Sequence, residues 1–252
     1  MVNTMENPEK LPLQKDIISK GKWDVLIVLD ACRYDVFKAL FHKEFNIKPV
    51  ISSGSCTIEW FYKTFTRKYD DVVYVSGNPY ISRFKVTLGD MSYVASKFFY
   101  HLTEGWREGW RSINGIFTVC PKTLTLIAKT VANLYKSKRL IIHFLQPHAP
   151  YPLCDSLRKY FVNDKGSPDK YLWKALRNNE VDKKLAFECY VRNLKWVMTY
   201  VEDLINFFKD KKIVITSDHQ EFFGENGIYN HPCGLKDSRL RIVPWAIKKS
   251  KK

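Results

Sequence analysis

The chain has 252 residues and a formal net charge of +15, and 45% of its residues are hydrophobic. This length and composition fit one large α/β domain, or a domain with a small appendage, and exclude a chain too short or too polar to bury a core. No apolar run approaches the roughly 20 residues of a membrane span, and the first residues lack the basic and then apolar pattern of a signal peptide, so we expect a cytoplasmic protein. The positive charge favours anionic partners such as phosphate or sulfate esters, nucleic acid or an anionic membrane surface.

The N-terminal part divides into a polar lead-in and a first buried strand. Residues 1–22 are polar and carry two prolines, so we expect them outside the core, with residues 23–252 as a single α/β domain. Asp24–Asp30 reads DVLIVLD, and its five consecutive apolar residues predict a strand buried on both faces. Asp30 closes that strand at its C-terminal end, where it could bind a ligand or cap the following helix, which we expect to run to about Glu44.

Small hydroxyl residues precede the next predicted helix. Val50–Trp60 reads VISSGSCTIEW, and the aromatic-rich stretch Ile58–Tyr69 follows as a helix. Thr57 is a natural N-cap for this helix, and Glu59 complements the dipole in its first turn. A hydroxyl at this place also faces the anion site that a helix N-terminus provides.

The middle of the chain is harder to interpret. Val72–Ser76 predicts another strand, and Pro121–Lys138 predicts an amphipathic helix that starts at a proline. Between them, residues 80–118 mix aromatic with basic residues. We interpret that segment as a lid or peripheral packing, with base stacking in a nucleic-acid site as the less favoured alternative.

A third buried strand is predicted over Leu140–Leu145, interrupted by His143, which we interpret as a core histidine. His148 follows between two prolines that stiffen the backbone, where it is well placed to meet a substrate oxygen. Asp182–Lys209 is the longest predicted helix, and its apolar residues recur at three- and four-residue spacings, so one face packs on the sheet.

The strongest pattern lies in Ile213–Pro232, which reads IVITSDHQEFFGENGIYNHP. Ile213–Thr216, in which Ile and Val dominate, predicts another strand buried on both faces, and Ser217, Asp218 and His219 follow it directly. Such a pair suits Zn²⁺, Mn²⁺ or a similar divalent ion. Glycines further on allow a tight return of the backbone, which could bring His231 back beside the pair.

Buried strands therefore alternate with helices along the chain. This order predicts an α/β fold with a mostly parallel central sheet and helices on both faces.

Five segments in this order resemble motifs of the alkaline phosphatase superfamily, in its sulfatase-like branch: DACRYD, GSCTIEW, QPHAPY, SDHQEFFGENGIYNH and LRIVPW. The resemblance spans nearly the whole chain and implies a compact alkaline-phosphatase-like domain. Three positions depart from the motifs. Gln220 replaces the usual glycine, Ala31 stands where many relatives carry a second acid, and Cys56 lacks the Pro, Ser and Arg that direct its conversion to formylglycine.

The resemblance implies a metal centre formed by Asp30, Asp218 and His219, together with Thr57. The ion would be Zn, Mn, Mg or Ca. One ion is expected and a second is left open, because Ala31 removes an acid. Thr57 would be the nucleophile that the ion activates, and Ser55 is the second choice.

Three further residues receive roles from the same resemblance. His148 and His231 would stabilise the equatorial oxygens of the transferred group or protonate the leaving group. Arg33 would bind an anionic oxygen, or pair with a surface acid instead.

The expected function is metal-dependent hydrolysis or transfer of phosphate or sulfate esters, which leaves phosphatase, phosphodiesterase and sulfatase activities open. One alternative is a phosphotransferase on a lipid or polyol head group that uses the same site. Another is a non-catalytic protein that binds nucleic acid or another anion through its positive charge. The oligomeric state is left open.

Six cysteines are scattered without a CxxC pair: Cys32, Cys56, Cys120, Cys154, Cys189 and Cys233. Their spacing favours buried or free thiols over disulfides or a zinc ribbon.

Overall fold

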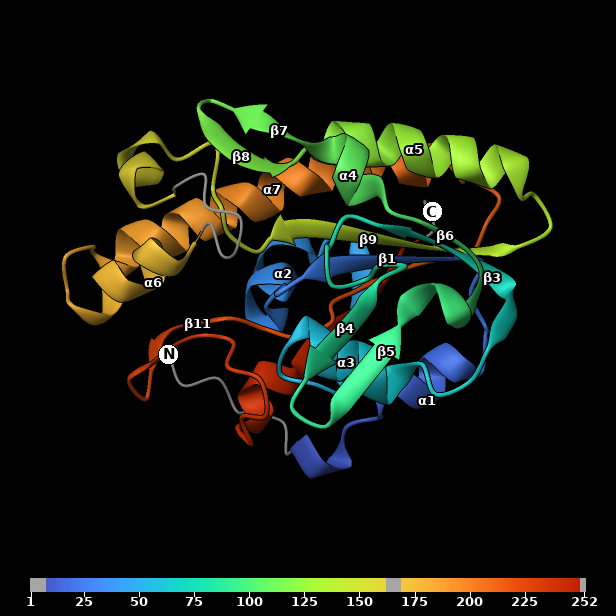
Figure 1. The fold of residues 1–252 in the computed structure, drawn as a ribbon, viewed down its shortest axis with the longest axis horizontal. Helices are drawn as coiled ribbons and strands as arrows, with labels where there is room; N and C mark the ends of the chain where they lie inside the picture. The colour runs from blue at the N-terminus through green and yellow to red at the C-terminus, as the bar shows by residue number, and fades with distance from the viewer. Residues whose placement is uncertain (1–7, 162–168, 250–252) are drawn as a thin grey trace.

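The computed structural model describes residues 8–161 and 169–249. Its centre is a seven-stranded sheet in the order β2-β13-β10-β1-β9-β3-β6. Figure 1 shows β1 and β9 side by side in this sheet. The bounds, in that order, are Phe45–Ile51, Ile242–Lys248, Ile213–Thr216, Val25–Asp30, Arg139–Pro147, Tyr69–Ser76 and Phe99–Thr103. Strands β10, β1, β9, β3 and β6 are parallel, and β13 pairs antiparallel with both β10 and β2. The predicted mostly parallel sheet is therefore confirmed.

Three hairpins extend from this sheet. They are β4 with β5 (Lys85–Leu88, Met91–Val94), β7 with β8 (Trp110–Ile113, Ile116–Val119) and β11 with β12 (Phe222–Glu225, Ile228–Asn230). Short 3-10 helices lie at Pro8–Lys10, Ala95–Lys97, Asp155–Tyr160 and Ser238–Arg241.

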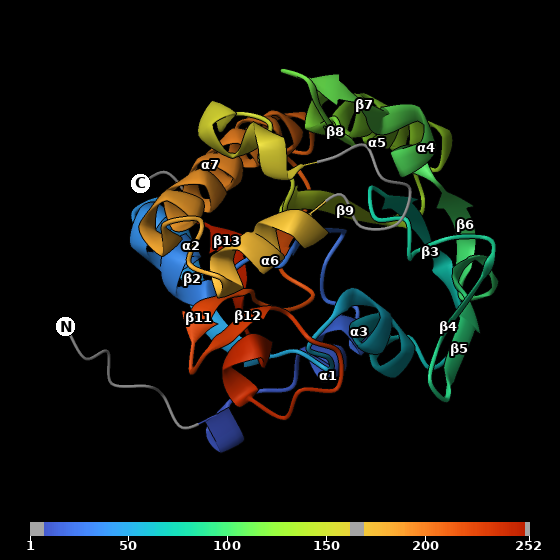
Figure 2. The same ribbon diagram turned by 60° about the vertical axis from the view of Figure 1, so that its left-hand side comes forward.

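Helices cover both faces of the sheet, as the turned view in Figure 2 shows. One face carries α2 (Tyr34–Phe41), α5 (Pro121–Leu134) and α7 (Lys183–Phe207), whose buried residues share a core with Ile27 and Leu29 of β1. The other carries α1 (Gln14–Ser19) and α3 (Thr57–Thr64), which share a second core with Leu26 and Val28. The shorter helices are α4 (Gly105–Gly109) and α6 (Lys170–Arg177). Successive residues of β1 enter opposite cores because side chains along a strand point alternately to its two faces.

The helix that was expected over Ile58–Tyr69 ends at Thr64 instead. Tyr69 opens β3, where its partner in β6 is Phe99. Strand pairing and burial of the ring have overridden the local helical pattern. The same pairing shows that residues 80–118 are not only peripheral, because they supply the edge strand β6.

The expectation that residues 1–22 lie outside the core is wrong for α1. Ile18 is fully buried and belongs to the second core. Gln14 is also fully buried, and its amide donates to Thr216 Oγ1 and to the Ser217 carbonyl, both at 2.7 Å. Its oxygen accepts a hydrogen bond from Trp60 Nε1 at 2.8 Å. This side chain therefore joins the end of β10 to α3.

Within the described part of the chain, no helix combines the length and the hydropathy that a membrane crossing requires.

Replacing Gln14 with methionine is expected to destabilise the protein by about 1–3 kcal/mol, because the indole N–H and a buried carbonyl lose their partner. Lys15→Ala, one residue further on and exposed, should change the free energy of unfolding by no more than about 0.5 kcal/mol. Urea unfolding measures both. Equal stability of the two variants would show that Gln14 does not join β10 to α3.

Candidate metal centre and nucleophile

The predicted site residues meet at the C-terminal ends of the parallel strands. Asp30 is the last residue of β1, while Asp218 and His219 follow β10 after a single serine. His148 follows β9 directly. Side chains from the ends of neighbouring parallel strands share one crevice, the usual ligand site of an open α/β sheet.

Asp30, Asp218 and His219 form a buried cluster with metal-binding geometry. His219 Nε2 lies 3.4 Å from Asp30 Oδ1 and 3.3 Å from Asp218 Oδ2. His219 Nδ1 lies 2.9 Å from the Gln220 carbonyl, so Nδ1 carries the proton and the Nε2 lone pair faces the carboxylates. Asp30 Oδ1 is buried without a hydrogen-bond partner. These donor atoms fit one divalent cation.

The two carboxylates differ in their surroundings. Burial and the neighbouring charge of Asp218 raise the pKa of Asp30 well above its usual value. Burial also opposes ionisation of Asp218, but His219, His143 and the Thr57 hydroxyl together lower its pKa. Asp218 Oδ1 further accepts hydrogen bonds from the backbone N–H groups of Ala31 and His219. Asp218 is therefore the better-stabilised anion of the pair.

Thr57 lies directly against this cluster. Its hydroxyl donates to Asp218 Oδ2 at 2.7 Å and lies 3.3 Å from His219 Nε2. Thr57 is the first residue of α3 and not its predicted N-cap; Cys56 occupies the N-cap position and makes no side-chain capping hydrogen bond. Ser55 points elsewhere, since its hydroxyl lies 2.9 Å from both Glu59 Oε2 and the Pro232 carbonyl.

The sequence interpretation missed Asn78. Its amide donates to Asp30 Oδ2 at 2.6 Å and to Thr57 Oγ1 at 3.2 Å, and the residue is 3% exposed. Asn78 follows the C-terminal end of β3, next to β9 in the sheet. The one signal in the sequence that could have found Asn78 is its position just after the predicted strand Val72–Ser76.

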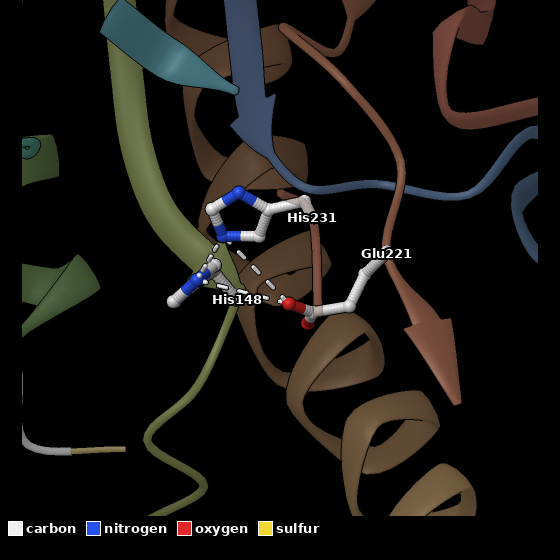
Figure 3. Close-up of side chains that lie close together, drawn as sticks. All are labelled: His148, Glu221 and His231. Carbon is white, nitrogen blue, oxygen red and sulfur yellow. Dashed lines mark hydrogen bonds and ion pairs between the residues drawn. The ribbon is translucent and has the colours of Figure 1, made fainter. Parts of the chain in front are cut away.

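His148, Glu221 and His231 form a second cluster beside the first (Figure 3). The Nε2 atoms of the two histidines are 2.8 Å apart, and they lie 3.7 Å and 3.9 Å from Glu221 Oε1. Both Glu221 carboxylate oxygens are buried without a hydrogen-bond partner. The His219 and His231 ring centroids are 4.2 Å apart, so the glycine-containing return does bring His231 to the Asp-His pair. Glu221 lies within the motif SDHQEFFGENGIYNH, but the sequence pattern alone indicates no role for it.

The second cluster can hold either a proton or a cation. Burial disfavours the charged ring of His148, but Glu221, Asp30 and Asp169 outweigh that effect and raise its pKa to about 10. Burial raises the pKa of Glu221 to about 8. Two nitrogens and a carboxylate oxygen are also suitable zinc ligands. The structure thus supplies donors for a second ion, although Ala31 removes one acid from the motif.

Arg33 is occupied by acids. Its guanidinium donates to Asp35 at 3.0 Å and 2.8 Å, and it forms an ion pair with Glu225. Its Nη1 also donates to the Glu221 carbonyl at 3.2 Å. This is the second of the two expected roles for Arg33, pairing with acids in place of a substrate oxygen.

Two departures from the motifs have structural reasons. Gln220 accepts a hydrogen bond from the Tyr34 backbone N–H at 3.1 Å and donates to the Arg239 carbonyl at 2.6 Å. Ala31 has a φ of 57° and is fully buried, with its carbonyl bound to the Tyr190 hydroxyl. Neither side chain reaches the metal cluster with a ligand atom.

The expectation of free thiols is wrong for four of the six cysteines. Cys56 is bonded to Cys233, and Cys154 is bonded to Cys189. The partners lie 177 and 35 residues apart in sequence, so spacing alone could not pair them. Disulfides persist mainly in oxidising compartments. The cytoplasmic location stays a prediction.

Comparison with solved structures identifies proteins of similar fold. A scan against protein-family models finds no match, and a search of curated proteins finds no relative. Among solved structures, the soluble domain of lipooligosaccharide phosphoethanolamine transferase A from Neisseria meningitidis matches with a TM-score of 0.60 at 16% identity, over 90% of this chain and 76% of that one. The C-terminal periplasmic domain of EcEptC from Escherichia coli, in complex with Zn, gives 0.56 at 14% identity over 90% and 72%.

Phosphonate monoester hydrolase of Agrobacterium radiobacter matches with a TM-score of 0.51 at 11% identity, over 88% of this chain and 67% of that one. These structures are alkaline-phosphatase-like domains. The chain therefore has the alkaline-phosphatase-like fold that its motifs predict.

Asp218→Ala and His219→Ala should each remove bound metal and activity together, because a centre with so few protein ligands cannot lose one. Asp210→Ala, an exposed acid in the turn after α7, is the matched control and should keep its metal. Elemental analysis of the purified proteins decides the outcome. Full occupancy in both site variants would reject these ligands.

His148→Ala is expected to reduce turnover while metal content stays near that of the wild type, because His148 is predicted to act on substrate. His101→Ala, which alters an exposed histidine, controls for the loss of an imidazole. If the wild type binds two ions and His148→Ala binds one, His148 is a ligand of a second metal instead.

The metal-free protein should lose stability between pH 6.5 and about 10, because the folded state holds the His148 proton that the unfolded state has released. This contribution is fully present below pH 6.5 and is lost as the pH rises through about 10. Chemical unfolding after chelation, compared with His148→Gln, isolates it. A constant difference between the two proteins over this range would contradict the raised pKa.

Proposed function

We propose that this chain is a metal-dependent enzyme that hydrolyses or transfers a phosphate ester through a covalent intermediate on Thr57. The observation that carries the proposal is the position of the Thr57 hydroxyl, 2.7 Å from Asp218 and 3.3 Å from His219, with Asn78 on its other side at 3.2 Å. A hydroxyl that acts as a nucleophile needs neighbouring groups that activate it, and Asp218 and His219 are placed to do so.

A divalent ion held by Asp30, Asp218 and His219 would lower the pKa of the Thr57 hydroxyl and polarise the ester. The other steps depend on residues of the chain. Thr57 Oγ1 attacks phosphorus, and its proton leaves along the hydrogen bond to Asp218. The bond from phosphorus to the leaving oxygen breaks, and His148 donates a proton to that oxygen, which its raised pKa allows. Water or an alcohol then attacks the phosphorus and gives its proton to His148, and the bond to Thr57 breaks as the Thr57 oxygen takes its proton back from Asp218.

Phosphate is favoured over sulfate for two reasons. Cys56 is disulfide-bonded, and it lacks the flanking residues that the formylglycine route of sulfatases requires. The similar structures carry names of phosphoethanolamine transfer and phosphonate ester hydrolysis. Those names support both an alcohol and water as the acceptor, so we propose the phosphate ester class and let the acceptor be measured.

A panel of aryl phosphate, bis-aryl phosphate and aryl sulfate esters, each assayed with Zn²⁺, Mn²⁺, Mg²⁺ and Ca²⁺, tests this proposal. Added glycerol or ethanolamine separates the two acceptors, since a transferase forms the phosphorylated alcohol and a hydrolase forms the free acid. Turnover of a phosphate ester that requires both metal and Asp218 is the expected result. Turnover of aryl sulfate alone, or of no ester with any metal, would reject the proposal.

Thr57→Ala should reduce turnover by several powers of ten while metal still binds, which corresponds to about 4 kcal/mol or more of transition-state stabilisation. Thr57→Ser keeps a hydroxyl and should retain much more activity. Ser55→Ala is the neighbouring control and should remain active, because the Ser55 hydroxyl contacts Glu59 and Pro232. Steady-state kinetics with the best ester of the panel measures all three. If Thr57→Ala remains active, the covalent route through Thr57 is wrong.

A further inference from the structure

His143 lies in the middle of β9, behind the metal cluster, and is fully buried. The sequence suggested an ordinary core histidine, but the structure satisfies only one side of the ring. Its Nδ1 lies 2.8 Å from the Tyr74 hydroxyl, whereas Nε2 is buried without a hydrogen-bond partner among the described residues. Nε2 faces Asp218 Oδ2 at 3.7 Å. A polar atom left unpaired in a core usually has a functional reason.

The surroundings determine which ring nitrogen carries the proton. A lone pair on Nε2 would face the carboxylate of Asp218 and be repelled by it, whereas an N–H there is attracted. Nδ1 is then free to accept from the Tyr74 hydroxyl, which is itself buried. The one N–H of a neutral ring therefore lies on Nε2, and the Nδ1 lone pair faces the Tyr74 hydroxyl. The Trp60 ring packs edge-on against the His143 ring at a centroid distance of 5.6 Å and fixes its plane.

We propose that His143 is a positioning residue of the metal centre. Its Nε2–H, oriented by Tyr74, faces Oδ2 of Asp218 from the buried middle of β9. This inference rests on the proposed function. Oδ2 is the oxygen that also accepts the Thr57 hydroxyl. Backbone N–H groups fix Oδ1, at 3.1 Å and 2.9 Å. The Nε2–H of His143 attracts Oδ2 in turn. It thereby holds this oxygen in the orientation that faces the metal and the nucleophile.

Three variants test this role. His143→Gln can accept from Tyr74 and donate to Asp218, whereas His143→Met has a similar volume and cannot donate. Tyr74→Phe keeps the ring that packs against Phe99 and removes only the hydroxyl. Zinc affinity of the chelated and reloaded proteins is measured by competition with a chromophoric chelator, with Asp218→Ala defining binding at any other site. Kinetics and thermal unfolding of the metal-free proteins complete the comparison.

His143→Met should weaken zinc binding at this centre by about 10–100-fold, the usual effect of losing a partner of a metal ligand. Tyr74→Phe should weaken it in the same direction, and His143→Gln should restore most of the affinity. Equal affinity of the Met and Gln variants would overturn the proposal, because packing alone would then explain His143. If His143→Met does not fold, unchanged affinity in Tyr74→Phe overturns it instead.

The affinity measurement needs no substrate, so the two proposals can fail separately. If zinc binds and depends on His143 but no phosphate ester is turned over, the proposed function fails and the positioning role stands. If the wild type turns over esters and His143→Met binds zinc normally, only the positioning role fails.

Discussion

The structure depends on burying two carboxylates side by side at the end of an apolar sheet. Asp30 is 2% exposed and Asp218 is fully buried, and within the described part of the chain no lysine or arginine forms an ion pair with either. Buried charges are tolerated only when they are paired, hydrogen-bonded or bound to a metal. The surrounding groups meet this need in part, through Thr57, Asn78 and backbone N–H groups. A cation bound by the donors of Asp30, Asp218 and His219, as proposed above, would meet the remainder.

Much of this arrangement could be predicted from local sequence. A run of apolar residues followed closely by an acid is a short-range pattern, and two such runs, before Asp30 and Asp218, were enough to predict two strands and to make these acids candidate metal ligands. Parallel strands then require that their C-terminal ends meet. Thr57 and His148 were located by the motifs that they belong to, and both lie where those motifs imply.

The residues that escaped prediction act over long sequence distances. Gln14 contacts Thr216, and Asn78 contacts Asp30. The residues next to Gln14 and Asn78 in the sequence give no sign of these contacts. The disulfide between Cys56 and Cys233 escaped for the same reason. Pairings of this kind are set by how helices and loops pack on the finished sheet, which composition and periodicity do not describe.

The order of strands has a consequence for synthesis of the chain. Strand β1 is made early, but its neighbours in the sheet are β9 and β10, which begin at Arg139 and Ile213. A growing chain therefore carries an apolar strand with both edges unpaired until most of it has left the ribosome, and such edges favour aggregation. Contacts of this separation also slow folding. Because Asp30 and Asp218 come together only when β10 joins β1, the proposed metal site can form only once the sheet is complete.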